Sequence, residues 1–198
     1  MPSPPNKIEQ ADKAVAEAIA PARDSAVVKT LGWLSEVADQ PQLITVCAAT
    51  LAAGLVGRNT RLTRVGIRML ASELLATGLK SVVKRQVDRT RPRVVDDGGA
   101  YAMESGDSDE SALNSFPSGH TAGAVTVARA FAREYPEMKL AAYGTAASIA
   151  AIQVPRCQHY PSDLAAGTVI GLIAEKIVDE MFEAVEAIAS KAASRDHD

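Results

Sequence analysis

The sequence predicts an all-α fold, a helical bundle of closely packed helices. Apolar residues make up 47% of the 198 residues, while aromatic residues account for only 4%. Few stretches show the alternation of β-branched and aromatic residues that is typical of strands. Apolar residues instead recur at helical spacing, and uncharged runs alternate with charged segments. A chain of this length fits one domain with a sizeable core.

Helices are expected along most of the chain. Residues 1–7 are a proline-rich start, and residues 8–37 carry apolar residues at helical spacing, interrupted by Pro21. Further helices are expected over residues 40–57, 62–83, 118–133, 138–154 and 161–189. The expected division is an N-terminal extension with a weak amphipathic helix (1–39), a helical domain (40–190) and a disordered tail (191–198).

Three uncharged runs favour a membrane-embedded bundle over a soluble one, which stays open as the alternative. They extend over residues 40–57, 140–155 and 164–174, and the first has 18 residues, just enough to span a bilayer. Alanine and glycine dominate the runs, and such small residues suit tight helix packing in either solvent. Two basic groups lie beside these segments, Arg58, Arg61 and Arg64 after the first run and Arg129, Arg133 and Lys139 after the third helix. The positive-inside rule would place both groups in the cytoplasm, with the site loops facing outward. The charged segment 8–37 is expected to lie on the surface and leaves the topology open.

Charge and cysteine content exclude several classes of protein. The net charge of −3 gives no support for a nucleic-acid partner. Cys47 and Cys157 lie far apart, so neither a disulfide framework nor a paired-cysteine metal site is expected. The first ten residues lack a basic region followed by an apolar core, so no secretory signal is expected. The oligomeric state is left open.

A basic cluster extends from Lys84 to Arg93. It contains five cations and one acid, Asp88. A solvated helix end or a membrane-surface anchor would explain this cluster on its own. The functional interpretation is a phosphate clamp, since lysine supplies a point charge and arginine a planar fork that matches phosphate oxygens.

The segment Pro117-Ser118-Gly119-His120 predicts a capped helix start. Ser118 is a good N-cap, and Gly119 lets the backbone approach a ligand closely. Free N–H groups at such a start form an anion site, with His120 beside it in the first turn. An ordinary capped helix with an incidental histidine is an equally good explanation of this segment alone.

A second histidine precedes the last helix. Pro161 suits a first helical turn, His159 lies just before it, and Asp163 follows four positions after the histidine. Asp163 is placed to accept a hydrogen bond from one ring nitrogen, which would leave the other nitrogen as a nucleophile in a fixed tautomer. A histidine next to a helix with a dipole-stabilising aspartate is the simpler alternative.

Together these clusters contain the parts that phosphoryl transfer needs. The chain has three histidines, and the third, His197, lies in the C-terminal tail. Cations for the oxygens, a nucleophile with an orienting group, and an acid for the leaving group are all present. No glycine-rich phosphate loop and no carboxylate–histidine set for a dinuclear metal centre occurs in the sequence. The predicted mechanism therefore uses neither a metal nor a cofactor.

The sequence resembles the superfamily of type-2 phosphatidic acid phosphatases and vanadium-dependent haloperoxidases, and its phosphatase branch in particular. Lys84 to Arg91-Pro92 matches the family's K-x6-R-P block, residues 117–120 match P-S-G-H, and His159 and Asp163 match the end of the third block. The resemblance implies a helical bundle with the active site at one end of the core helices.

The resemblance also implies roles for the matched residues. His159 would attack phosphorus, Asp163 would orient it, and His120 would protonate the leaving alkoxide and then activate water. The phosphate oxygens would be held by Lys84, Arg91, Ser118 and the N–H of Gly119.

The third block departs from the family pattern at its arginine. Gln153 occupies that position, while Arg156 lies three residues before His159. Either Arg156 reaches the phosphate from a different backbone point and replaces the arginine, or Gln153 donates a neutral hydrogen bond there.

The expected activity is metal-independent hydrolysis of phosphate monoesters, and of lipid phosphates of the phosphatidate or isoprenyl type, through a phosphohistidine intermediate. The expected location is a bacterial-type inner or cell membrane. Two alternatives are a vanadate-dependent haloperoxidase, which is usually much longer, and a degenerate family member that binds anionic lipid through residues 84–93. The lipid head group and chain are left open.

Overall fold

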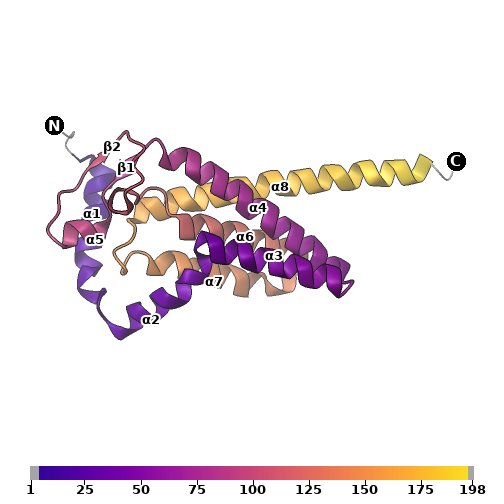
Figure 1. Cartoon of the computed structure of the whole chain (residues 1–198), viewed down its shortest axis with the longest axis horizontal. Coiled ribbons are helices and arrows are strands. Elements are labelled where there is room, and N and C mark those ends of the chain that lie inside the picture. Colours follow the sequence, from indigo (N-terminus) through magenta and orange to yellow (C-terminus); the bar gives the residue numbers. More distant parts are fainter. Residues whose placement is uncertain (1–4, 196–198) are drawn as a thin grey trace.

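The computed structural model describes residues 5–195 and is predominantly helical (Figure 1). The long helices are α3 (Gln40–Val56), α4 (Thr60–Lys84), α6 (Gly119–Glu134), α7 (Lys139–Ile152) and α8 (Pro161–Arg195). Shorter helices are α1 (Lys7–Ile19), α2 (Ala26–Ser35) and α5 (Pro92–Asp96), joined by the 3-10 turns η1 (Ala20–Ala22), η2 (Glu36–Ala38), η3 (Ser111–Leu113) and η4 (Pro136–Met138). An antiparallel pair of two-residue strands, β1 (Asp88–Arg89) and β2 (Met103–Glu104), lies in the loop between α4 and α6.

Helix α6 lies at the centre of the bundle. It packs against α4, α7 and α8, while α3 packs along α4 (Figure 1). The buried face of α6 is rich in alanine, so its neighbours approach the backbone closely. The buried alanines are Ala122, Ala124, Ala128, Ala130 and Ala132.

Glycines bring α8 into direct contact with the backbone of α6. A Cβ added at Gly167 would lie 2.5 Å from the carbonyl oxygen of Ser118, and one at Gly171 would lie 2.7 Å from that of Ala122. Both distances are shorter than any van der Waals contact, so only glycine fits at this helix crossing. The two helices that begin at the predicted site are therefore fixed to each other close to their N-termini.

A network of buried ion pairs joins α4, α6 and α8 away from the predicted site. Arg68 donates to Glu134 and Asp179, each at 2.8 Å, and the side chains of Arg68 and Asp179 are at most 8% exposed. Arg133 donates to the buried Glu175 at 2.8 Å and lies 2.9 Å from Asp179. Glu175 and Asp179 of α8 thus face the bundle interior.

The structure confirms the expected helices and differs at both ends of the chain. The interruption at Pro21 falls in η1, between α1 and α2. The tail expected to be disordered from residue 191 is helical as far as Arg195, and residues 196–198, with His197, lie outside the described part. The N-terminal extension does more than cover a surface, because Asp12 of α1 is buried against α8.

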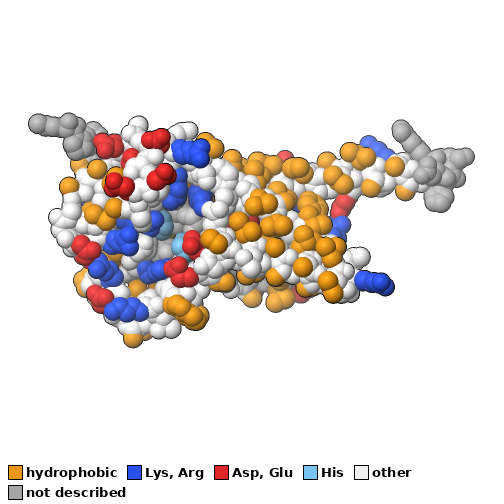
Figure 2. All heavy atoms as spheres, viewed as in Figure 1, with side chains coloured by type: hydrophobic (Ala, Val, Ile, Leu, Met, Phe, Trp, Pro, Cys, Tyr) orange, Lys and Arg blue, Asp and Glu red, His pale blue; other side chains and the backbone are white. Residues whose placement is uncertain are grey.

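Apolar side chains are exposed over much of the bundle, whereas charged side chains gather at the end that carries α1, α2 and α5 (Figure 2). Exposed apolar residues include Trp33, Leu55, Leu140, Ile173 and Ile188. Within residues 5–195, none of the helices combines the length and the hydropathy that crossing a bilayer requires. Membrane embedding therefore stays a prediction.

Candidate active site

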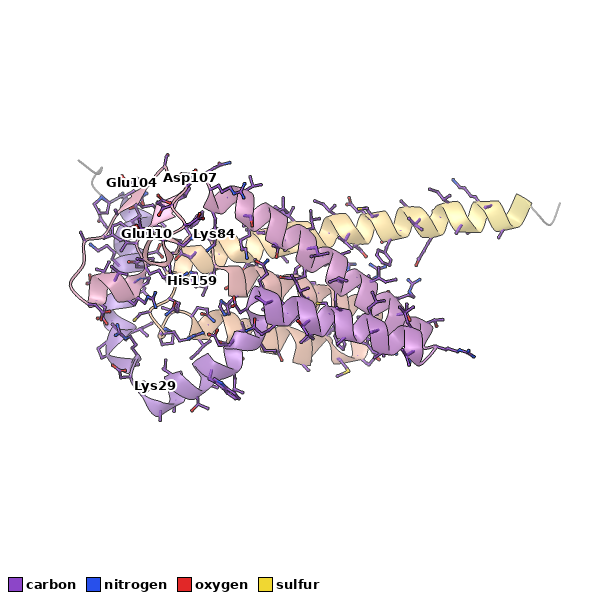
Figure 3. All side chains as sticks on the ribbon, in the orientation of Figure 1. Lys29, Lys84, Glu104, Asp107, Glu110 and His159 are labelled. Atoms are coloured by element: carbon purple, nitrogen blue, oxygen red, sulfur yellow. The ribbon has the colours of Figure 1, made fainter. Side chains whose placement is uncertain are left out.

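A cavity of about 350 Å³ opens at the charged end of the bundle. It brings together groups from the start of α6, the end of α4 and the loops before α5 and α8. Figure 3 labels Lys84 and His159 in this region, beneath the loop that carries Glu104, Asp107 and Glu110. The cavity is lined by Glu36, Asp39, Lys80, Lys84, Arg91, Arg93, Ser111, Gly119, His120, Gln153, Arg156, Gln158 and His159.

The imidazole of His159 is held through its Nδ1 atom. Nδ1 lies 2.7 Å from the carbonyl oxygen of Ser115, a distance at which a protonated Nδ1 donates a hydrogen bond. The expected partner Asp163 is farther away, with Oδ2 at 3.8 Å from Nδ1. A carbonyl can only accept, so this contact puts the proton on Nδ1 and leaves Nε2 with its lone pair.

Asp163 organises the groups around the histidine. Its Oδ2 accepts hydrogen bonds from the Ser115 hydroxyl at 2.6 Å and from the Tyr160 N–H at 2.8 Å, and its Oδ1 accepts from Arg89 at 2.6 Å. Asp163 thereby fixes both the residue that binds Nδ1 and the residue that follows His159.

Burial and charge act in opposite directions on this pair. Burial lowers the pKa of His159, although the nearby Asp163 carboxylate favours the protonated ring. Burial would raise the pKa of Asp163, but His159, Arg89 and the Ser115 hydroxyl together hold the pKa of that carboxyl below its usual value. Asp163 is therefore an anion beside a neutral imidazole at pH 7.

His120 lies across the cavity in the first turn of α6. Its Nε2 is buried, has no hydrogen-bond partner among residues 5–195, and lies 4.0 Å from Glu36 Oε1. Burial lowers the pKa of His120 to about 4, against the opposing effect of Asp39 and Glu36. A phosphate dianion in the cavity would raise this pKa, because a nearby anion stabilises the imidazolium.

Ser118 and Gly119 shape the start of α6 in different ways. Ser118 is fully buried, its hydroxyl accepts from the Thr121 N–H at 3.4 Å and the Thr121 hydroxyl at 3.0 Å, and it does not line the cavity. The Ser118 side chain is thus engaged in the helix cap, and its role in binding a phosphate oxygen stays a prediction. Gly119 does line the cavity, at a helix N-terminus that favours anions.

The two cations of the first sequence block lie at the cavity. Lys84 donates to the carbonyl of Asn114 at 3.1 Å, and Arg91 donates to the same carbonyl at 3.2 Å and to Gln158 Oε1 at 2.9 Å. Burial, reinforced by Arg91 and Lys80, lowers the pKa of Lys84 to about 8. Lysine and arginine side chains provide the positive charge of the cavity. Within the described residues, no group of three or more His, Cys, Asp or Glu side chains is placed to hold a metal ion.

Lys80 is a cavity residue that the sequence motifs did not indicate. It lies one helical turn before Lys84 on α4 and donates to Gln40 Oε1 at 2.9 Å. A Cβ added at Gly119 would lie 3.4 Å from Lys80 Nζ, so this ammonium group is next to the start of α6. The four-residue spacing from Lys84, which places both side chains on one face of a helix, was the available signal.

Arg156 and Gln153 both line the cavity, but their side chains bind other residues of the protein. Arg156 forms an ion pair with Glu36 and donates to the Ser35 hydroxyl at 2.8 Å. Gln153 is fully buried and donates to the carbonyl of Ile149 at 3.0 Å and to the Ser35 hydroxyl at 3.3 Å. Arg156 therefore points a partly neutralised guanidinium at the cavity, and Gln153 supports the wall behind it.

This helical bundle, with two histidines and several cations at one end, belongs to a known family. The model of the PAP2 superfamily matches residues 65–184, which is more than half of the chain, so the protein is a member of the PAP2 superfamily. The family prediction made from the three sequence blocks is confirmed.

Two curated relatives match a shorter part of the chain. The lipid A 1-phosphatase of Rhizobium johnstonii is 31% identical over 107 residues, covering 54% of this chain and 43% of that protein. The lipid A 1-phosphatase of Rhizobium etli is 30% identical over 107 residues, covering 54% of this chain and 46% of that protein. The chain spans less than half the length of these relatives.

Solved structures share the fold. A transmembrane PAP2-type phosphatidylglycerolphosphate phosphatase from Bacillus subtilis superimposes with a TM-score of 0.59 at 18% identity, covering 91% of this chain and 89% of that one. Aquifex aeolicus LpxE superimposes with a TM-score of 0.57 at 20% identity, covering 84% and 93%. These likenesses confirm the predicted all-α helical bundle.

Proposed function

We propose that this protein is a metal-independent phosphatase that hydrolyses lipid phosphate monoesters through a phosphohistidine on His159. One observation carries the proposal. His159, with its Nδ1 directed to the Ser115 carbonyl, and His120, with a free Nε2, line one cavity together with the cations Lys84 and Arg91.

The first step is attack of the His159 Nε2 lone pair on phosphorus. A bond forms between Nε2 and phosphorus while the bond from phosphorus to the ester oxygen breaks. His120, protonated in the presence of the substrate dianion, transfers its proton to the leaving alkoxide. The Ser115 carbonyl and the nearby Asp163 carboxylate stabilise the positive charge that develops on the His159 ring.

The second step releases phosphate. Water attacks phosphorus on the side opposite Nε2, His120 accepts a proton from the water, and the phosphorus–nitrogen bond breaks. His159 returns to its neutral form with the proton still on Nδ1, and inorganic phosphate leaves. Lys84, Arg91 and the N–H of Gly119 bind the oxygens, whose negative charge grows in both transition states.

A lipid substrate is supported by the surface around the cavity. Exposed apolar side chains cover the bundle, and Trp33, Leu31 and Leu34 of α2 continue this surface near the charged end. An apolar surface of this extent is typical of contact with a membrane or with lipid. The two curated relatives carry names for lipid A phosphatases, which points the same way. In this proposal the apolar surface contacts a membrane and the cavity lies at its edge.

The test combines turnover with trapping of the intermediate. The wild-type chain, purified in detergent, should release phosphate from phosphatidate and from p-nitrophenyl phosphate, also in the presence of EDTA. Brief reaction with ³²P-labelled substrate should give an acid-labile, base-stable phosphoenzyme. His159→Ala should lose turnover and the trapped label together, whereas Lys29→Ala, on the exposed surface of α2, should keep both.

Three results would contradict the proposal. A labelled phosphoenzyme that persists in His159→Ala would mean another nucleophile. Bromide oxidation with vanadate, in a protein that releases no phosphate, would favour the haloperoxidase alternative, and lipid binding without any turnover would favour a degenerate member.

A further inference from the structure

We propose that Asp12, on the N-terminal helix α1, is a positioning residue for the nucleophile His159 and acts through Arg89 and Asp163. This inference rests on the proposed phosphatase activity. It adds to that activity a residue outside the part of the chain that matches the family model, residues 65–184. The active site would then be completed by a helix that the sequence blocks do not include.

Asp12 reaches from α1 to the first turn of α8. Its Oδ1 accepts a hydrogen bond from the Ser162 N–H at 3.0 Å. Its Oδ2 accepts from the Ser162 hydroxyl and, at 2.8 Å, from Arg89 Nη2. The side chain is buried, so these contacts are shielded from water. A carboxylate on an amphipathic helix that only covered a surface would instead be exposed.

Arg89 connects Asp12 to Asp163. Its Nη1 donates to Asp163 Oδ1 at 2.6 Å and to the Ser162 hydroxyl at 2.8 Å, while Nη2 donates to Asp12. Arg89 is fully buried, and its guanidinium carbon lies 4.2 Å from the centre of the Tyr160 ring. The guanidinium thus shares its one positive charge between two carboxylates in a site without solvent.

Asp163 connects Arg89 to the residues that surround His159, the proposed nucleophile. The carboxylate that binds Arg89 also accepts from the Ser115 hydroxyl and the Tyr160 N–H, and the carbonyl of Ser115 binds His159 Nδ1. Hydrogen bonds therefore link Asp12 to Arg89, Asp163 and the Ser115 hydroxyl, and the backbone carbonyl of the same Ser115 binds the imidazole. If Asp12 lost its charge, Arg89 would be balanced by Asp163 alone, and Asp163 would be drawn towards Arg89 and away from Ser115.

Loss of the Asp12 charge would also make the surroundings of His159 more positive. A more positive surrounding disfavours the positive charge that the ring gains when it attacks phosphorus, so the chemical step should slow down. Asp163, Arg91 and Lys84 act on His159 directly, and the cavity it lines also carries the charged or titratable groups Lys80, His120, Arg93, Arg156, Glu36 and Asp39.

The test variant is Asp12→Asn, which keeps an acceptor for the Ser162 N–H and removes the charge. We expect kcat for p-nitrophenyl phosphate to fall at least about tenfold with little change in KM, because the nucleophile is displaced while the phosphate-binding cations stay in place. The acid limb of kcat/KM should move to lower pH, since the buried network that leads to His159 loses one negative charge. A general loss of folded protein would lower kcat at every pH without moving that limb.

Glu17→Gln is the matched control, because Glu17 is an exposed carboxylate on the same helix. It should leave kcat and the pH profile unchanged. An unchanged kcat in Asp12→Asn, or an equal loss in Glu17→Gln, would overturn the proposal. If Asp12→Asn does not fold, Asp12→Glu provides the readout, because it keeps the charge on a longer side chain. In that variant kcat should fall while the acid limb of kcat/KM stays at its wild-type pH. A wild-type kcat would overturn the proposal.

A double variant tests whether Asp12 acts through Arg89. In an Arg89→Gln background, Asp12→Asn should cause no further loss of kcat, because the connecting guanidinium is already absent. A further loss as large as in the wild-type background would exclude Arg89 as the connection. A wild-type chain that hydrolyses no phosphate monoester would overturn the proposed function itself, whereas an active wild type with an unaltered Asp12→Asn would overturn only this inference.

Discussion

Glu36 forms an ion pair with Arg156 at the wall of the cavity, so the cation nearest to His159 in the sequence already has an anionic partner. Glu36 belongs to η2, the turn between α2 and α3, and its side chain is 42% exposed. A phosphate dianion entering the cavity would compete with this carboxylate for the guanidinium. The pair gives a direct way to ask whether Arg156 or Gln153 replaces the arginine of the family pattern.

We expect Arg156→Ala to lower kcat/KM at least about tenfold, which corresponds to about 1.4 kcal/mol of lost transition-state stabilisation. Gln153→Ala should be milder, because Gln153 donates to the chain's own Ile149 carbonyl and Ser35 hydroxyl. Glu36→Gln should lower KM, since Arg156 would no longer be neutralised before substrate binds. A silent Arg156→Ala together with a damaging Gln153→Ala would reverse the assignment, and steady-state kinetics with thermal melts of each variant would decide.

His120 is expected to matter most for poor leaving groups. A general acid contributes about 10²–10⁴-fold, but a leaving group as stable as p-nitrophenolate needs little protonation. His120→Ala should therefore lose far more activity with an alkyl phosphate than with p-nitrophenyl phosphate. The ratio of the two losses, measured on one preparation, is the readout. Equal losses would mean that His120 only binds the substrate.

The alkaline pH dependence should report on Lys84. Its pKa, lowered to about 8 by burial and by Arg91 and Lys80, lies well below that of an ordinary lysine. As pH rises through this value the ammonium group loses its proton and the cavity loses one positive charge. KM for a phosphate monoester should then rise by up to about tenfold per pH unit. Lys84→Arg, which keeps its charge, should flatten this limb, and an unchanged limb in that variant would assign it to another group.

The buried ion pairs of α4, α6 and α8 predict a contrast in stability. Arg68→Met leaves Asp179 buried with Arg133 alone, and loss of one partner of a buried pair costs about 3–5 kcal/mol. Arg61→Met, on the same helix, removes an exposed pair with Glu137 and should cost at most about 1 kcal/mol. Unfolding in detergent by heat or denaturant measures both variants. Similar losses of unfolding free energy in the two variants would mean that burial does not determine how much these ion pairs stabilise the fold.

The sequence was sufficient for the helices because helical spacing of apolar residues and the caps are local signals. Pro21, Ser118 and Pro161 fall where α1, α6 and α8 end or begin. The spacing within the three sequence blocks also predicted several of the residues that line the cavity, including Lys84 and His159.

The features that could not be predicted from the sequence depend on contacts between residues that are far apart in the chain. The acceptor for His159 Nδ1 is a backbone carbonyl, which no residue pattern can reveal. Asp12 lies in the segment predicted to be a weak amphipathic helix, and no sequence pattern links it to its partner Arg89, 77 positions later. The inward direction of Glu175 likewise depends on arginines of α6.

The close contact between the backbones of α6 and α8 at Gly167 and Gly171 fixes the relative positions of the site residues at the starts of these helices. His120 and Asp163 lie in the first turns of these two helices, and His159 lies two residues before α8. The distance between His120 and His159, the proposed general acid and nucleophile, is therefore determined by two backbones in direct contact and by the hydrogen bonds that hold His159. Substitutions on the exposed apolar faces of the helices can accumulate without altering that distance, so the exposed apolar surface and the proposed catalytic centre can evolve independently.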